Sequence, residues 1–87
     1  MKTLWIAREQ DTTPGGADTL TPCDDREDAL TKATCYLNRL TDREKKTHAV
    51  TIEAYKVDCP ENATAEEAYE SLNDHPWWPD PIIYEKL

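Results

Sequence analysis

The chain has 87 residues, of which 38% are hydrophobic and 32% charged, and its formal net charge is −8. This length supports one small hydrophobic core, so we expect a single domain over residues 1–87. The negative charge disfavours direct binding to nucleic acid or to an anionic membrane, and no apolar stretch reaches the roughly 20 residues that a membrane-spanning helix needs.

The first half of the chain carries patterns for one or two strands and a long helix. Residues 2–9 favour a β-strand, and residues 17–21, beyond a loop with Pro14-Gly15-Gly16, are a second strand candidate that would form a hairpin with the first. Residues 24–40 favour a helix, because acidic residues crowd its start and apolar residues recur at spacings of three and four. These apolar residues are Ala29, Leu30, Ala33, Tyr36, Leu37 and Leu40.

The second half predicts a turn, a strand, a shorter helix and a last strand. Thr41 and Glu44 form a capping-box pattern that indicates a helical turn through Lys46. Residues 48–57 alternate and are apolar on both faces toward their end, which favours a central strand. A further capping-box pattern, Thr64 with Glu67, starts a short helix that ends near Asp74. Prolines then interrupt regular structure until residues 81–86, which favour an edge strand.

The resulting order is β-(β)-α-β-α-β, which predicts an α+β fold. We expect a small antiparallel sheet of three to four strands covered by the main helix over residues 24–40, with the second short helix at the edge or end of the sheet. The predicted core is Leu30, Ala33, Leu37, Val50 and Ile52.

The three cysteines predict reduced thiols. Cys23, Cys35 and Cys59 are odd in number, form no C-x-x-C pair and follow no signal-peptide pattern, so we expect a cytoplasmic protein without a disulfide. Cys35 is expected to be partly or fully buried on the main helix. Cys23 and Cys59 are expected in or beside loops.

The sequence gives little support for catalysis or metal binding. His48 and His75 have no neighbouring nucleophile, and Ser71 is expected in the middle of a helix. No carboxylate is recognised in an apolar run that would raise its pKa for general acid catalysis. The ligand spacings of zinc and calcium sites are missing. We therefore predict no catalytic residue, cofactor or metal.

The first candidate binding feature is a group of acidic residues on and around the second helix. The region from Ala49 to Leu87 carries nine acids and two bases, a net charge of −7. Glu66, Glu70 and Asp74 are spaced by four and share one helix face. This face either binds a basic surface or is an ordinary solvated face. The whole candidate group is Asp58, Glu61, Glu66, Glu67, Glu70 and Asp74.

The second candidate feature is the adjacent pair Trp77 and Trp78, which lies between Pro76 and Pro79. In an extended segment the two side chains point in opposite directions. One would pack on the core while the other is a rigid exposed anchor of the kind that dominates interfaces. Alternatively, both close off the end of a small core that contains no Phe.

The motifs Trp5-Ile6-Ala7-Arg8, Arg26-Glu27-Asp28-Ala29-Leu30 and Leu40-Thr41-Asp42-Arg43-Glu44-Lys45-Lys46 resemble a set of short uncharacterised acidic proteins from phages and integrated elements of gut Clostridia and other Firmicutes. The resemblance covers about the first 57 residues and implies a mobile-element context without a specific activity. Small acidic phage proteins include anti-CRISPR and other anti-defence inhibitors, many of which occupy a nucleic-acid site with acidic side chains, and this link is an analogy of class only.

The sequence therefore predicts a non-enzymatic binding or inhibitor protein that uses an acidic surface against a basic, nucleic-acid-handling protein partner, and the resemblance implies a phage-derived anti-CRISPR or anti-defence protein. The alternative is a small accessory protein that binds through the Trp/Pro-rich segment. A monomer or weak dimer is expected in either case.

Overall fold

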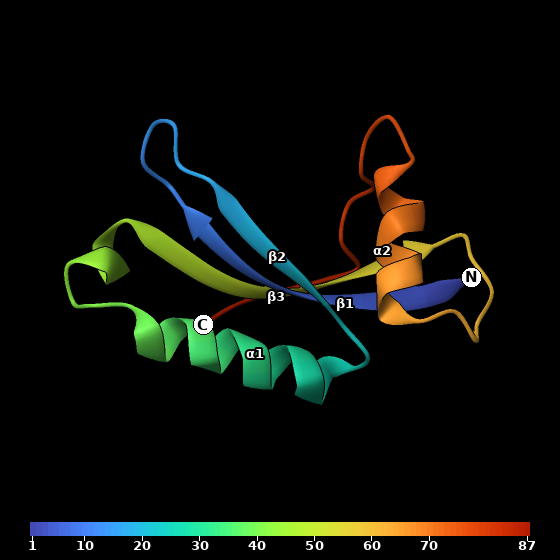
Figure 1. Cartoon of the computed structure of the whole chain (residues 1–87), viewed down its shortest axis with the longest axis horizontal. Coiled ribbons are helices and arrows are strands. Elements are labelled where there is room, and N and C mark those ends of the chain that lie inside the picture. Colours follow the sequence, from blue (N-terminus) through green and yellow to red (C-terminus); the bar gives the residue numbers. More distant parts are fainter.

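Four antiparallel strands form one sheet in the computed structural model, which describes all residues from Met1 to Leu87 (Figure 1). The sheet has the order β2-β1-β3-β4, and two helices and one 3-10 turn complete the chain. The α+β class and the order of elements predicted from the sequence are confirmed. The elements are β1 (Lys2–Asp11), β2 (Asp18–Cys23), α1 (Arg26–Arg39), η1 (Glu44–Lys46), β3 (His48–Val57), α2 (Ala65–Asn73) and β4 (Ile83–Lys86).

The hairpin of β1 and β2 is longer than the sequence pattern suggests. β1 continues to Asp11, where the pattern ends at residue 9, and β2 extends to Cys23. The pairing runs from Trp5 opposite Cys23 to Gln10 opposite Asp18. Gly15 adopts a positive φ of 78° in the connecting turn, a conformation that favours glycine. The second strand candidate is therefore a regular edge strand.

Helix α1 covers one face of the sheet through small residues. The side chain of Asp25 caps the helix by accepting a 2.8 Å hydrogen bond from the amide of Asp28. Ala29 and Ala33 are completely buried and pack in a cluster that also contains Ala7, Cys23, Leu40, Val50 and Ile52. Two alanines at the contact let the helix backbone approach the sheet closely.

This close approach corrects part of the predicted core. Leu30 and Leu37 are only half-buried, because they lie beside the line of contact that Ala29 and Ala33 make. Cys35, which was expected to be partly or fully buried, is exposed on the opposite side of the helix. The expected burial of Ala33, Val50 and Ile52 is confirmed.

Helix α2 packs on the opposite face of the sheet (Figure 1). Its apolar stripe of Ala65, Ala68 and Leu72 forms a second cluster with Leu4, Ile6, Tyr55 and Val57. We expected α2 at the edge or end of the sheet. It does lie at the end of the sheet nearest the N-terminus, but it packs on a face of the sheet there. Since β3 is central and contributes to both clusters, it is buried on both sides.

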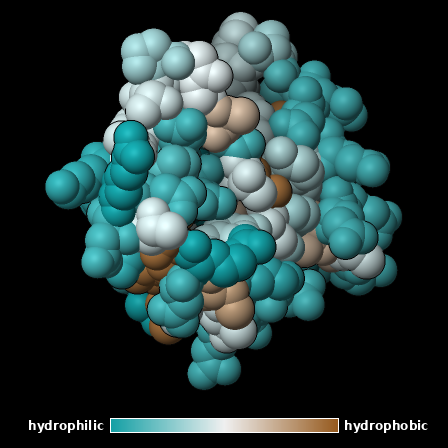
Figure 2. All heavy atoms as spheres, turned by 60° about the vertical axis from the view of Figure 1, so that its left-hand side comes forward, coloured by the Kyte–Doolittle hydropathy of each residue, from teal (hydrophilic) through white to brown (hydrophobic).

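The molecule is elongated, with principal extents of 41 × 28 × 18 Å. Its face at the hairpin turn and η1 is mostly hydrophilic and shows only small, separated apolar spots (Figure 2). Helix α2 lies toward the other end of the long axis. Neither helix combines the length and the apolar character needed to cross a membrane.

Candidate functional site

The acidic residues of α2 point into solvent because the opposite side of the helix is packed on the sheet. Ala65, Ala68 and Leu72 are at most 8% exposed, which fixes the orientation of the helix. The exposed side carries Glu66, Glu67, Glu70 and Asp74. The predicted acidic face therefore exists as a continuous surface, and we call these four residues the α2 acidic surface.

One member of the α2 acidic surface has a structural role. Glu67 accepts a 3.0 Å hydrogen bond from the amide of Thr64, whose hydroxyl accepts one of 3.1 Å from the amide of Glu67. This is the capping box predicted from the sequence. The hydrogen bond from the Thr64 amide holds the pKa of the Glu67 carboxyl below its ordinary value.

The other three members, Glu66, Glu70 and Asp74, form no ion pair. Carboxylates four residues apart on a helix repel one another, and no lysine or arginine offsets that repulsion here. This surface is consequently the part of α2 with the greatest capacity to bind a cationic group.

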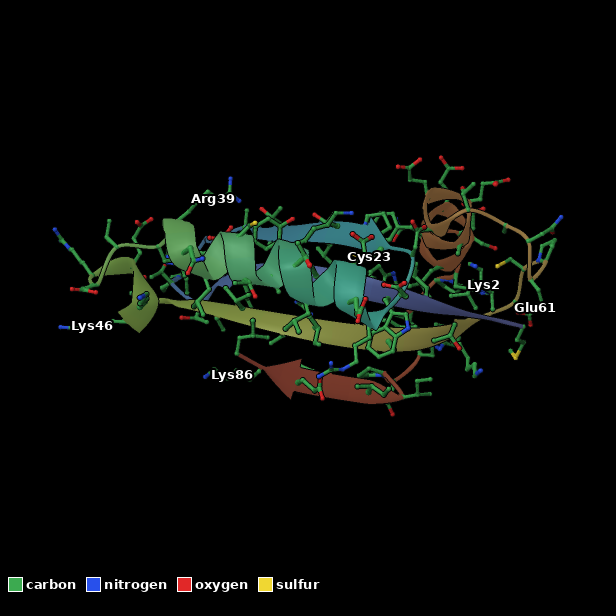
Figure 3. The ribbon with its side chains drawn as sticks, turned by 90° about the horizontal axis from the view of Figure 1, so that it is seen from below. Lys2, Cys23, Arg39, Lys46, Glu61 and Lys86 are labelled. Atoms are coloured by element: carbon green, nitrogen blue, oxygen red, sulfur yellow. The ribbon has the colours of Figure 1, made fainter.

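Two of the predicted acidic residues precede α2 in the chain. Glu61 is in the loop before the helix, where its carboxylate is 3.5 Å from the amino group of Met1 and its carbonyl accepts a 3.4 Å hydrogen bond from Lys2 (Figure 3). Asp58 is exposed just after β3, and its carbonyl oxygen lies 3.5 Å from the hydroxyl of Ser71. Glu61 is thus partly neutralised, whereas the carboxylate of Asp58 is free.

Two open hollows flank the C-terminal half of α2. The larger, about 440 Å³, is lined by Glu67, Glu70 and Asp74 together with Cys59 and Ser71. We call it the acidic hollow. Its polar lining and open shape suit a solvated basic side chain more than an apolar ligand.

The second hollow, about 250 Å³, is more apolar and we call it the Trp77 hollow. Its apolar lining comes from Met1, Val57, Leu72, Trp77 and Pro79, and its polar lining is Lys56, Asp58 and His75. The two features singled out in the sequence therefore meet at the same end of the molecule, on two sides of α2.

The two tryptophans have different environments. Trp78 packs against the cluster below α2, edge-on to Tyr55 and Tyr69, and its indole N–H donates a 3.2 Å hydrogen bond to Asn73. The side chain of Trp77 is 77% exposed. Of the two arrangements considered from the sequence, the structure has the one with a single packed tryptophan.

A buried carboxylate on β3 was missed in the sequence. Glu53 is 1% exposed and accepts hydrogen bonds from the hydroxyls of Tyr55 and Thr51, the latter at 2.9 Å. Its Oε2 lies 3.5 Å from Nη1 of Arg8, which also pairs with Asp18. The sequence analysis did not single out this buried carboxylate, and Tyr55 and Val57, which lie on the same face of β3 as Glu53, were the available signal.

This network is internally satisfied. Burial, supported by the hydrogen bond and the charge of Glu53, raises the pKa of the Tyr55 hydroxyl. No buried polar side-chain atom lacks a hydrogen-bond partner, and Glu53 lines neither hollow. The network is thus a structural connection between β1, β2 and β3.

The cysteines and histidines do not converge. All three thiols are free, and no group of three or more His, Cys, Asp or Glu side chains is arranged to hold a metal ion. Cys23 is buried at the end of β2, and burial raises the pKa of its thiol. Cys59 is half-buried in the loop after β3.

Comparison of the chain with protein-family models, curated proteins and solved structures finds no match. The functional argument therefore depends on the surface at α2 and on its chemistry.

Proposed function

We propose that the protein is a non-enzymatic binding protein that presents the α2 acidic surface to a basic protein partner. One observation carries this proposal: Glu66, Glu70 and Asp74 are exposed on one helix face and have no ion-pair partner. A basic surface would relieve their mutual repulsion on binding.

The distribution of charge along the molecule supports the same surface. Arg39 and Lys46 lie toward the end of the long axis opposite α2 (Figure 3). These two basic residues are thus distant from the α2 acidic surface, whereas Lys2 and Lys56 lie at the same end of the molecule as α2 without pairing with its carboxylates. The negative field of these carboxylates accelerates encounter with a positively charged surface.

A narrower form of the proposal concerns the identity of the partner. A protein that handles nucleic acid has a basic groove, which the carboxylates of α2 would occupy in place of phosphates. In this form the protein would be an inhibitor encoded by a phage or integrated element, and its partner would be a nucleic-acid-guided defence complex. The resemblance in the sequence motivates this narrower form.

The second candidate function is an interaction centred on Trp77, favoured by the 77% exposure of that side chain. Exposed tryptophans are frequent binding hot spots. An interface of this kind would depend on apolar contact and little on ionic strength.

The test begins with a pull-down from bacterial lysate that contains nucleic-acid-guided defence complexes, followed by binding kinetics with the recovered partner. In the variant Glu66→Lys/Glu70→Lys we expect a lower association rate, and the loss should shrink at high salt. The control Glu27→Lys/Asp42→Lys makes the same change of net charge at exposed acids outside α2.

The control variant is expected to bind nearly as well as the unmodified protein. An equal loss in both double variants would show that only net charge matters and would overturn the proposed surface. Full binding by the α2 variant, together with loss of binding by Trp77→Ala, would replace the acidic surface with the aromatic one.

A further inference from the structure

The Trp77 hollow combines an exposed aromatic ring with a free carboxylate. Its volume of about 250 Å³ is sufficient for one long side chain, and Leu72 and Val57 form an apolar base. Asp58 also lines the hollow and has no ion-pair partner. An aromatic face next to a carboxylate is the combination that binds an organic cation.

Met1, Lys56 and His75 line the hollow, and none of them forms an ion pair with Asp58. Lys56 contributes to its lining, but its Nζ donates a 3.0 Å hydrogen bond to the hydroxyl of Thr3. The amino group of Met1 lies 3.5 Å from the carboxylate of Glu61. Asp58 is therefore not neutralised by an ion pair within the chain, while the charge of Lys56, whose partner is a neutral hydroxyl, remains in the lining.

The backbone at Trp77 is restrained by the packing of its neighbour. Trp78 is held between Tyr55 and Tyr69 and hydrogen-bonded to Asn73, and prolines precede and follow the pair. Since the backbone is restrained, little conformational entropy is lost when Trp77 contacts a ligand.

We propose that the Trp77 hollow receives an arginine side chain of the partner, with the guanidinium over the indole and paired to Asp58. This inference rests on the proposed function, because it assigns the chemistry of one contact made by the basic partner. A purely apolar side chain fits less well, since it would desolvate Asp58 without providing a charge. Arginine is favoured over lysine because a planar guanidinium both stacks on an aromatic ring and pairs with a carboxylate.

The test uses the full chain, labelled with ¹⁵N, and a capped Gly-Arg-Gly peptide as the probe. The matched control peptide contains citrulline, which has nearly the same shape as arginine but no charge. We expect saturable shifts of the Trp77 indole N–H and the Asp58 amide with the arginine peptide. Binding of the citrulline peptide should be at least about fivefold weaker.

Two variants locate the contact. Trp77→Ala should abolish the saturable shift at the Asp58 amide, and Asp58→Asn should weaken arginine binding by at least about threefold while leaving citrulline binding unchanged. Both residues are exposed, so the dispersion of the amide spectrum should be retained in each variant.

The outcomes separate this inference from the proposed function. Shifts at Glu66 and Glu70 without any at Trp77 would overturn the arginine site and leave the α2 acidic surface in place. Equal binding of the arginine and citrulline peptides would also overturn it. A saturable Trp77 shift that persists in Glu66→Lys/Glu70→Lys would support the arginine site independently of the α2 acidic surface.

Discussion

The indole ring of Trp78 meets the ring of Tyr55 edge-on, with 5.4 Å between the ring centroids and 77° between the ring planes. Tyr69 makes a similar contact with the same indole, at 6.0 Å. Trp78 thus extends the cluster that joins α2 to the sheet. Its neighbour Trp77 takes no part in this packing and is free to contact another molecule.

The first prediction separates these two tryptophans by stability. Trp78→Ala should lower the free energy of unfolding by about 3 kcal/mol, because it removes two aromatic contacts and leaves a void beside Tyr55. Trp77→Ala should change it by less than about 0.5 kcal/mol, since the side chain is exposed. Urea unfolding followed by circular dichroism measures both. Similar losses in the two variants would contradict the different environments of the rings.

The sequence predicts that adjacent tryptophans point in opposite directions, but it does not identify the buried one. That choice depends on the position of α2, which packs on the face of the sheet that contains Tyr55. The same long-range placement decides which of the two hollows contains Trp77. Local patterns therefore located the candidate residues, whereas their grouping around α2 needed the tertiary structure.

The second prediction concerns the two cores. Leu72→Ala should destabilise the protein by about 2–5 kcal/mol, because Leu72 is completely buried between α2 and the sheet. Leu37→Ala should cost clearly less, since Leu37 is half-buried at the margin of the α1 contact. The two denaturation midpoints test this order, and a larger loss for Leu37→Ala would show that α1 docks through its leucines.

Helix α1 shows why periodicity alone misplaced part of the core. Its apolar stripe contains both alanines and leucines, and spacing does not reveal which of them face the sheet. The contact is made through Ala29 and Ala33 because small residues permit close approach. The strands were easier to predict, because β3 has apolar residues on both faces as a central strand should.

The third prediction concerns thiol reactivity. Under native conditions Cys35 should be alkylated fastest by iodoacetamide, because it is exposed on α1. Cys23 should react last, since it is 2% exposed and burial raises its pKa, which lowers the fraction of reactive thiolate. Mass spectrometry after short reaction times gives the order. Rapid modification of Cys23 would mean that the end of β2 opens readily.

The fourth prediction is a dependence of stability on alkaline pH. Neutral Tyr55 ionises with an ordinary pKa of 10.0 when unfolded and with a raised pKa when folded. The unfolded state therefore loses the proton first, so this contribution to stability is complete below about pH 10 and falls as pH rises further. Urea midpoints at about pH 9 and about pH 11 should differ less in Tyr55→Phe than in the unmodified protein. An unchanged difference would exclude Tyr55 as the source.

Glu53 is the residue on which sequence reasoning failed most clearly. A glutamate in an alternating strand is normally assigned to the solvated face, and only Tyr55 and Val57, on the same face of the strand, suggested otherwise. Its partner Arg8 comes from β1, 45 positions earlier in the numbering, and is aligned with it only by the register of the sheet. Such pairing of distant residues is not visible in local patterns.

The last prediction tests the role of this buried carboxylate. Glu53→Gln keeps the shape of the side chain and an acceptor for the Tyr55 hydroxyl, but it removes the charge that faces Arg8. We expect a loss of about 1–3 kcal/mol, because the hydrogen bonds to a buried charged group are weakened. Asp18→Asn is the matched control, since Asp18 pairs with the same arginine at a more exposed position, and it should cost less than about 1 kcal/mol. If both variants unfold at the same urea concentration as the unmodified protein, the ion pair contributes nothing and Glu53 is held in place by its hydroxyl partners alone.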